Sequence, residues 1–118
     1  MANHNELGKE GEQLAEKYLL ENDFSILYRN WRYSHYEVDI IAVRKDIPHF
    51  IEVKCRSSQS FGRPELSVGK EKIRYLIRAA EEFMHRHPVY KDFRIDILSI
   101  CTHRKAKTEY FLIEDVYL

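Results

Sequence analysis

Apolar residues recur along the chain with two different spacings, and these spacings predict the order of the elements. Stripes at three- and four-residue spacing predict one helix over residues 5–21 and a second, more regular one over residues 67–87. Shorter alternating or continuously apolar segments predict strands over 24–32, 36–44, 49–56, 93–101 and 108–114. Asp46-Ile47-Pro48 predicts the turn of a hairpin between the second and third strands.

Two amphipathic helices and five strands predict an α/β fold of three layers, with one helix on each face of the sheet. The helix over 67–87 lies between the third and fourth strands, so we expect it to be a crossover connection. Residues 40–43 are apolar on both faces, which favours a strand covered from both sides. A chain of 118 residues is long enough for one domain, here 1–118, and too short for two of ordinary size.

Composition narrows the classes of protein that remain. Nineteen basic and nineteen acidic residues leave no net charge, so binding to nucleic acid would need a local basic patch. No run reaches the roughly 18 apolar residues that span a bilayer. Two separated cysteines and six scattered histidines give no disulfide framework and no zinc-binding spacing, so a structural zinc site is not expected. The composition favours a reduced, cytoplasmic protein.

The candidate chemistry lies on the second and third predicted strands. Side chains alternate between the faces of a strand, so Glu37 and Asp39 share one face, as do Glu52 and Lys54 on the next strand. If the two strands pair, Asp39 and Glu52 converge, with Lys54 beside them. Both carboxylates are surrounded by apolar residues, where an uncompensated charge costs several kcal/mol.

Two arrangements would compensate these carboxylates. A hard divalent cation such as Mg²⁺ prefers one or two carboxylates together with waters and phosphate oxygens. Alternatively, Lys54 forms an ion pair with Asp39 or Glu52 and no metal is involved. The spacing of the residues leaves both arrangements open.

A basic segment follows the Glu-x-Lys strand directly. Residues 54–78 hold seven basic and two acidic residues, a local excess of five positive charges. Such a segment can contact phosphates, although a solvated basic helix face would have the same composition. The candidate DNA-binding residues are Arg56, Arg63, Lys70 and Arg74.

An acidic residue on one strand of a hairpin, followed by Glu-x-Lys on the next, resembles the PD-(D/E)xK nuclease motif. The whole chain resembles one family of that superfamily, the YraN-like predicted endonucleases, which are related to archaeal Holliday junction resolvases. The matching segments run in order over nearly the full length. They are Glu6–Leu19, Asn30–Arg32, Glu37–Ala42, Glu52–Arg56 and Arg94–Asp96.

This resemblance implies a restriction-endonuclease-like core and metal-dependent cleavage of DNA phosphodiester bonds, with branched or junction DNA as one candidate substrate. Asp39 and Glu52 would hold Mg²⁺ or Mn²⁺, and Lys54 would stabilise developing charge and orient the attacking water. Glu12 of the first helix would complete the acidic site, unless it is a solvent-facing glutamate. The alternative function is a nucleic-acid-binding module of the same fold with little catalysis. Analogy with the resolvases also favours a homodimer.

Overall fold

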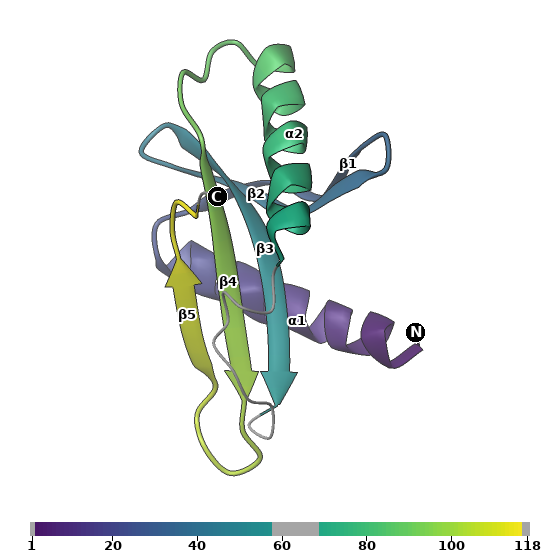
Figure 1. The fold of residues 1–118 in the computed structure, drawn as a ribbon. Helices are drawn as coiled ribbons and strands as arrows, with labels where there is room; N and C mark the ends of the chain where they lie inside the picture. The colour runs from purple at the N-terminus through teal and green to yellow at the C-terminus, as the bar shows by residue number, and fades with distance from the viewer. Residues whose placement is uncertain (1, 58–68, 117–118) are drawn as a thin grey trace.

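The computed structural model describes residues 2–57 and 69–116, with side chains described from Lys9 onwards. Every predicted helix and strand is present, and the α/β class is confirmed. The elements follow one another in the predicted order (Figure 1): α1 (Ala2–Glu21), β1 (Ser25–Tyr33), β2 (Tyr36–Arg44), β3 (Ile47–Ser57), α2 (Lys70–Arg86), β4 (Arg94–Thr102) and β5 (Glu109–Ile113).

The five strands form one mixed sheet in the order β1-β2-β3-β4-β5. Pairing is antiparallel except between β3 and β4, which run parallel. Parallel neighbours need a crossover, and α2 supplies it, as the sequence predicts. β3 is therefore the central strand, paired with β2 over residues 47–51 and with β4 over residues 49–57.

The two helices cover opposite faces of the sheet (Figure 1). On one face, Ala15 and Leu19 of α1 pack with Ile51 of β3. On the other face, Leu76 and Phe83 of α2 pack with Val38, Ile41 and Phe50. The successive residues Phe50 and Ile51 thus contribute to different cores, because side chains alternate across a strand. The three-layer arrangement is confirmed.

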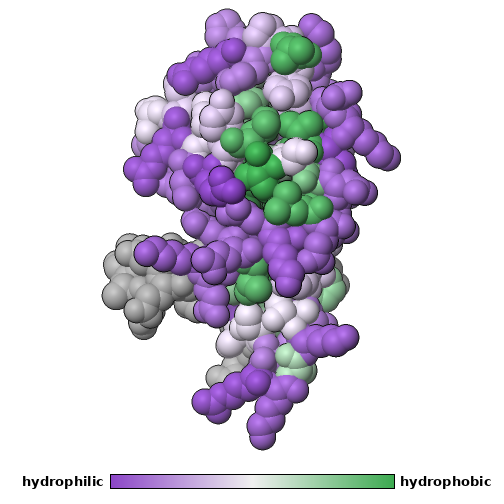
Figure 2. All heavy atoms as spheres, turned by 180° about the vertical axis from the view of Figure 1, so that it is seen from behind, coloured by the Kyte–Doolittle hydropathy of each residue, from purple (hydrophilic) through white to green (hydrophobic). Residues whose placement is uncertain are grey.

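Hydrophilic side chains cover most of the surface seen from behind, with an apolar area in its upper half (Figure 2). The large hydrophobic residues that the described chain exposes are Leu20, Leu27, Tyr28, Val89 and Phe111. Within the described residues, none of the helices combines the length and the apolar character needed to cross a membrane.

The turn between β2 and β3 differs from the prediction. Ile47 pairs with Arg44 and Pro48 with Val43, so both belong to β3. The turn itself is Lys45-Asp46, with φ of 54° and 65°. Positive φ at both positions is the geometry that a two-residue hairpin turn requires. Neither residue is the glycine that usually marks such a turn, and this is why the prediction placed it one residue later. Pro48 is tolerated near the start of its strand.

The helix starts also differ from the prediction. α1 begins at Ala2 rather than at residue 5. α2 begins at Lys70, with Gly69 in the N-cap position and no side-chain cap, whereas the apolar stripe predicted a start at Ser67. Ser67 lies outside the described residues. At its other end α2 stops at Arg86, two residues before Pro88, as expected for a residue that cannot continue a helix.

Candidate active site

The candidate site lies where β2 and β3 cease to pair. Their ladder runs from Arg44–Ile47 to Ile40–Ile51, and Asp39 and Glu52 are the next residues along each strand. β2 continues beside β1, while β3 continues beside β4. The backbone N–H of Val53 then has no partner on β2, and it donates instead to Asp39 Oδ2 at 2.9 Å. This bond fixes the Asp39 carboxylate at the point of separation.

Glu52 is buried beside Asp39, with an exposed fraction of only 6%. Lys72 Nζ lies 3.7 Å from Glu52 Oε1, and Lys54 Nζ lies 3.8 Å from Oε2. Both distances exceed hydrogen-bonding length. Within the described part of the chain, Glu52 Oε1 is buried and accepts no hydrogen bond. A buried carboxylate oxygen without a hydrogen-bond donor lowers the stability of the fold, and such atoms in native proteins are often kept for a function.

The electrostatics of the site follow from this burial. Burial and, next to it, the neighbouring Asp39 carboxylate together raise the pKa of Glu52 from 4.5 to about 7, against the opposing charges of Lys72 and Lys54. The Glu52 carboxyl therefore titrates near neutral pH. A perturbed carboxyl of this kind is typical of functional sites.

The stability of the metal-free protein should reflect this titration. The folded-state pKa of Glu52 lies above its usual value, so the folded state holds the proton more tightly than the unfolded state. The contribution of Glu52 to the free energy of unfolding is therefore fully favourable below about pH 4.5 and is lost as the pH rises through 7. As the pH rises from 5 to 8, the free energy of unfolding of Glu52→Gln should increase by about 2–3 kcal/mol relative to that of the native protein. Urea unfolding in the presence of a chelator measures this difference. Parallel pH profiles for the two proteins would contradict it.

Lys72 is a site residue that sequence reasoning missed. In the sequence it is only one of the seven basic residues of segment 54–78, and the motif assigns it no role. It precedes Ile73, the first buried residue of α2, and Ile73 packs with Ile97 of β4. Lys72 could have been recognised from its position in the sequence. It is a basic residue next to the first buried position of the helix that covers the Glu-x-Lys strand.

Glu12 lies on the other side of the sheet from α2. α1 approaches β3 closely at Gly11, where an added Cβ would lie 3.2 Å from Cys55 Cβ. The adjacent Glu12 is half-buried, and its charge acts on Arg29, which pairs with Glu16 at 2.6 Å. Among the described residues, no hydrogen bond or ion pair joins Glu12 to Asp39, Glu52 or Lys54. Its role in the acidic site stays a prediction.

The candidate DNA-binding residues lie around the same region. Arg56 is half-buried on β3 and, by alternation, shares the face of Lys54. Lys70 and Arg74 are exposed and lie one turn apart on α2, on either side of Lys72 in the sequence. Because Lys72 contacts Glu52, the first turn of α2 lies at the site. Arg63 falls outside the described residues.

The chain is similar in sequence to several known proteins. A UPF0102 protein of Bacteroides thetaiotaomicron is 42% identical over 85% of this chain and 83% of its own. A UPF0102 protein of Flavobacterium psychrophilum is 40% identical over 99% of this chain and 98% of its own. Among solved structures, the fold is similar to that of Archaeoglobus fulgidus Hjc, a Holliday junction resolvase from an archaeal hyperthermophile, with a TM-score of 0.50 and 14% identity over 87% of this chain and 74% of that one.

These findings agree with the family and the fold that the sequence predicts. The likeness to Hjc shows a restriction-endonuclease-like fold. Residues 11–100, which include Asp39, Glu52 and Lys54, match the uncharacterised protein family UPF0102. With relatives of 40% identity over nearly the whole length, the chain belongs to the uncharacterised protein family UPF0102.

Proposed function

We propose that this protein is a DNA endonuclease that depends on Mg²⁺ or Mn²⁺. The observation that carries the proposal is the buried Glu52 carboxylate beside Asp39, with one oxygen that accepts no hydrogen bond within the described residues. Two adjacent carboxylates, one of them with its pKa raised to about 7 by burial and by the other, suit a hard divalent cation. Asp39 and Glu52 would hold this ion.

When bound, the metal supplies an activated water near neutral pH and a positive charge against the phosphate. The residues of the chain prepare the site for this chemistry. Asp39 is held in place by the Val53 N–H, so its orientation is set before any ligand arrives. Lys54, with a side chain 36% exposed, can reach a phosphate at the surface while its stem stays beside Glu52. It would stabilise the negative charge that builds on the phosphate.

The proposed substrate is DNA, with branched DNA as the favoured class. The fold is similar to that of Archaeoglobus fulgidus Hjc, a Holliday junction resolvase, and this supports the choice by analogy only. The sharpest test is a panel of linear, nicked, flapped and four-way DNAs, each incubated with Mg²⁺, Mn²⁺ or a chelator. We expect metal-dependent cleavage, fastest on a branched DNA. Absence of cleavage of every DNA with either metal would contradict the proposal.

The first turn of α2 is expected to contact the DNA backbone. Changing Lys70 and Arg74 together to Glu should weaken binding equally for different sequences, because phosphate contacts carry no sequence information. The slope of log affinity against log salt should fall by about two, roughly one for each lost contact. Titration of labelled DNA at several salt concentrations measures both effects.

Lys91→Glu provides a control for charge reversal away from this surface, with half the change in net charge. Lys91 is exposed and lies beyond the opposite end of α2, where its Nζ donates to the Pro88 carbonyl. This variant should bind DNA nearly as the native protein does. If it costs half as much binding free energy as the change at Lys70 and Arg74, in proportion to its charge, net charge and not a localised surface determines affinity.

A second candidate function is a DNA-binding module without catalysis. The observation that favours it is the pair of lysines, Lys54 and Lys72, one near each oxygen of Glu52, which together form an ion-pair network without metal. The two functions differ in one measurement, because a binding module retains DNA at every metal concentration and leaves it uncut.

A further inference from the structure

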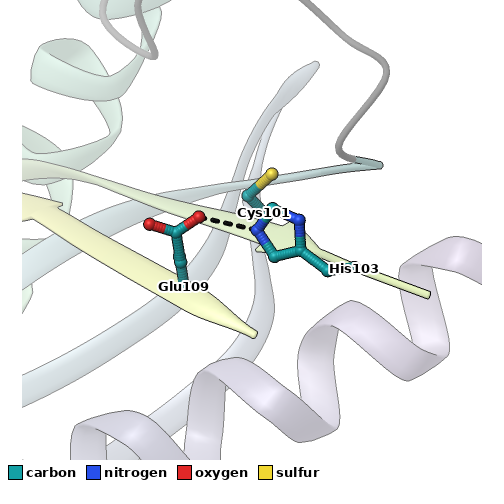
Figure 3. Close-up of side chains that lie close together, drawn as sticks. All are labelled: Cys101, His103 and Glu109. Carbon is teal, nitrogen blue, oxygen red and sulfur yellow. Dashed lines mark hydrogen bonds and ion pairs between the residues drawn. The ribbon is translucent and has the colours of Figure 1, made fainter. Parts of the chain in front are cut away.

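A second group of metal-ligating side chains lies at the far end of β4 (Figure 3). Cys101 on β4 is paired with Glu109 on β5, so their side chains lie on the same face of the hairpin. His103 follows two residues after Cys101, and its Nε2 lies 2.6 Å from Glu109 Oε1. One potential ligand atom from each of the three side chains falls within 4.8 Å of the others.

The chemistry of these three groups is unlike that of the Asp39–Glu52 pair. A thiolate, an imidazole and one carboxylate are the ligands that Zn²⁺ and related first-row ions prefer, whereas Mg²⁺ prefers oxygen alone. Cys101 and His103 are partly exposed and Glu109 is exposed, so an ion can enter from solvent. Three protein ligands leave a fourth tetrahedral position for water.

A further group of potential ligands within the described residues already has partners of its own. His49, Asp96 and Glu114 also lie within 4.8 Å of one another. There, however, His49 Nδ1 and Asp96 Oδ2 are 2.5 Å apart, Asp96 Oδ1 accepts the N–H of Asp115, and Glu114 pairs with Arg44. These three side chains therefore already bind one another, the backbone or an arginine.

The Cys101 group has fewer competing partners. In the part of the chain that the structure describes, Glu109 has no ion pair with a lysine or arginine, and its side chain contacts His103. The thiol of Cys101 is free. A cation could therefore bind here by replacing the contact between His103 and Glu109, without breaking a network that the fold needs.

We propose that Cys101, His103 and Glu109 form a binding site for Zn²⁺ or a chemically similar divalent ion. Binding removes the thiol proton of Cys101 and any proton shared between His103 and Glu109, and both side chains then turn to the metal. In the parallel register of β3 and β4, Cys101 is the neighbour of Arg56, and Ser99 is the neighbour of Lys54. The ion would thus lie on the face of the sheet that carries the candidate DNA-binding residues.

Titration of the full chain with Co²⁺, and with Zn²⁺ in competition, tests this site. With the thiols reduced, Co²⁺ should give a sulfur-to-cobalt charge-transfer absorption that Zn²⁺ abolishes and that excess Mg²⁺ leaves intact. Cys101→Ser should remove the absorption and raise the dissociation constant for Zn²⁺ at least about tenfold, since losing even an outer-shell partner costs 10–100-fold. Cys55→Ser is the matched thiol control, because Cys55 packs against Gly11 of α1, and it should retain the absorption.

Two results would contradict a metal site at Cys101, His103 and Glu109. No thiolate absorption in the native protein, or an absorption that survives Cys101→Ser, would overturn the site. If Cys101→Ser does not fold, the exposed Glu109→Gln decides by the same rise in the dissociation constant, and an unchanged constant would overturn it. Glu52→Gln should leave the cobalt–thiolate absorption and its loss on adding Zn²⁺ unchanged, so failure of the endonuclease proposal and failure of this one are distinguishable.

Discussion

Glu52→Gln is expected to abolish divalent-metal binding at the Asp39–Glu52 site and to lower the rate of DNA cleavage by about a thousandfold or more. A metal ion contributes several kcal/mol to stabilising the charge of such a transition state, and about 4 kcal/mol corresponds to a thousandfold in rate. Asp39→Asn should have the same effect on cleavage. Mn²⁺ calorimetry and single-turnover cleavage at saturating Mn²⁺ measure the two losses.

The same substitution should make the metal-free protein more stable at alkaline pH. A glutamine does not carry the charge that burial penalises, and this penalty is the reason for the raised pKa of Glu52. Loss of activity together with a gain of stability would be the mark of a site kept for function at a cost to the fold. It would also show that the inactive variant is folded, which activity alone cannot.

Glu37→Gln is the control for Glu52→Gln. Glu37 lies on β2, two residues before Asp39, and pairs with Arg32 at 3.2 Å on the sheet surface. Its removal should leave cleavage and metal binding nearly unchanged. Native cleavage rates in Glu52→Gln, or an equal loss in Glu37→Gln, would contradict the assignment of the metal site to Asp39 and Glu52.

The parts of this site that sequence could predict are those that depend on one strand at a time. The bounds of β2 match the prediction, because residues 40–43 are apolar on both faces and the flanking residues are polar. Alternation along β2 and β3 was enough to place Asp39 and Glu52 together. The position of Lys54 beside Glu52 follows from the same two-residue period.

The parts that sequence could not predict depend on how separate elements lie against one another. Lys72 contacts Glu52 because of the rotation of α2 about its own axis, which Ile73 fixes by packing on Ile97. The group of Cys101, His103 and Glu109 depends on the register between β4 and β5. Cys101 and His103 are only two residues apart in the sequence, but the register is what brings Glu109 beside them as the third ligand type.

Lys54→Met is expected to lower cleavage by a hundredfold or more while leaving the fold intact. The Lys54 side chain is 36% exposed and lies 3.8 Å from Glu52 Oε2, and Lys72 remains near the other oxygen. Loss of one partly exposed cation should therefore cost at most about 1 kcal/mol of stability. A hundredfold in rate corresponds to about 3 kcal/mol of transition-state stabilisation. Single-turnover cleavage, DNA affinity and urea unfolding measure the three quantities.

Lys72→Met separates a role in the transition state from a mere effect on Glu52. Both lysines lower the pKa of Glu52 by their charge, so either substitution should raise this pKa and move the pH profile of cleavage toward alkaline pH. If Lys54 acts on the phosphate itself, Lys72→Met recovers its activity as the pH rises and Lys54→Met does not. Two variants that recover alike would reduce Lys54 to an ion-pair partner of Glu52. A Lys54→Met protein that is strongly destabilised, whether or not metal is present, would favour the ion-pair network over the enzyme.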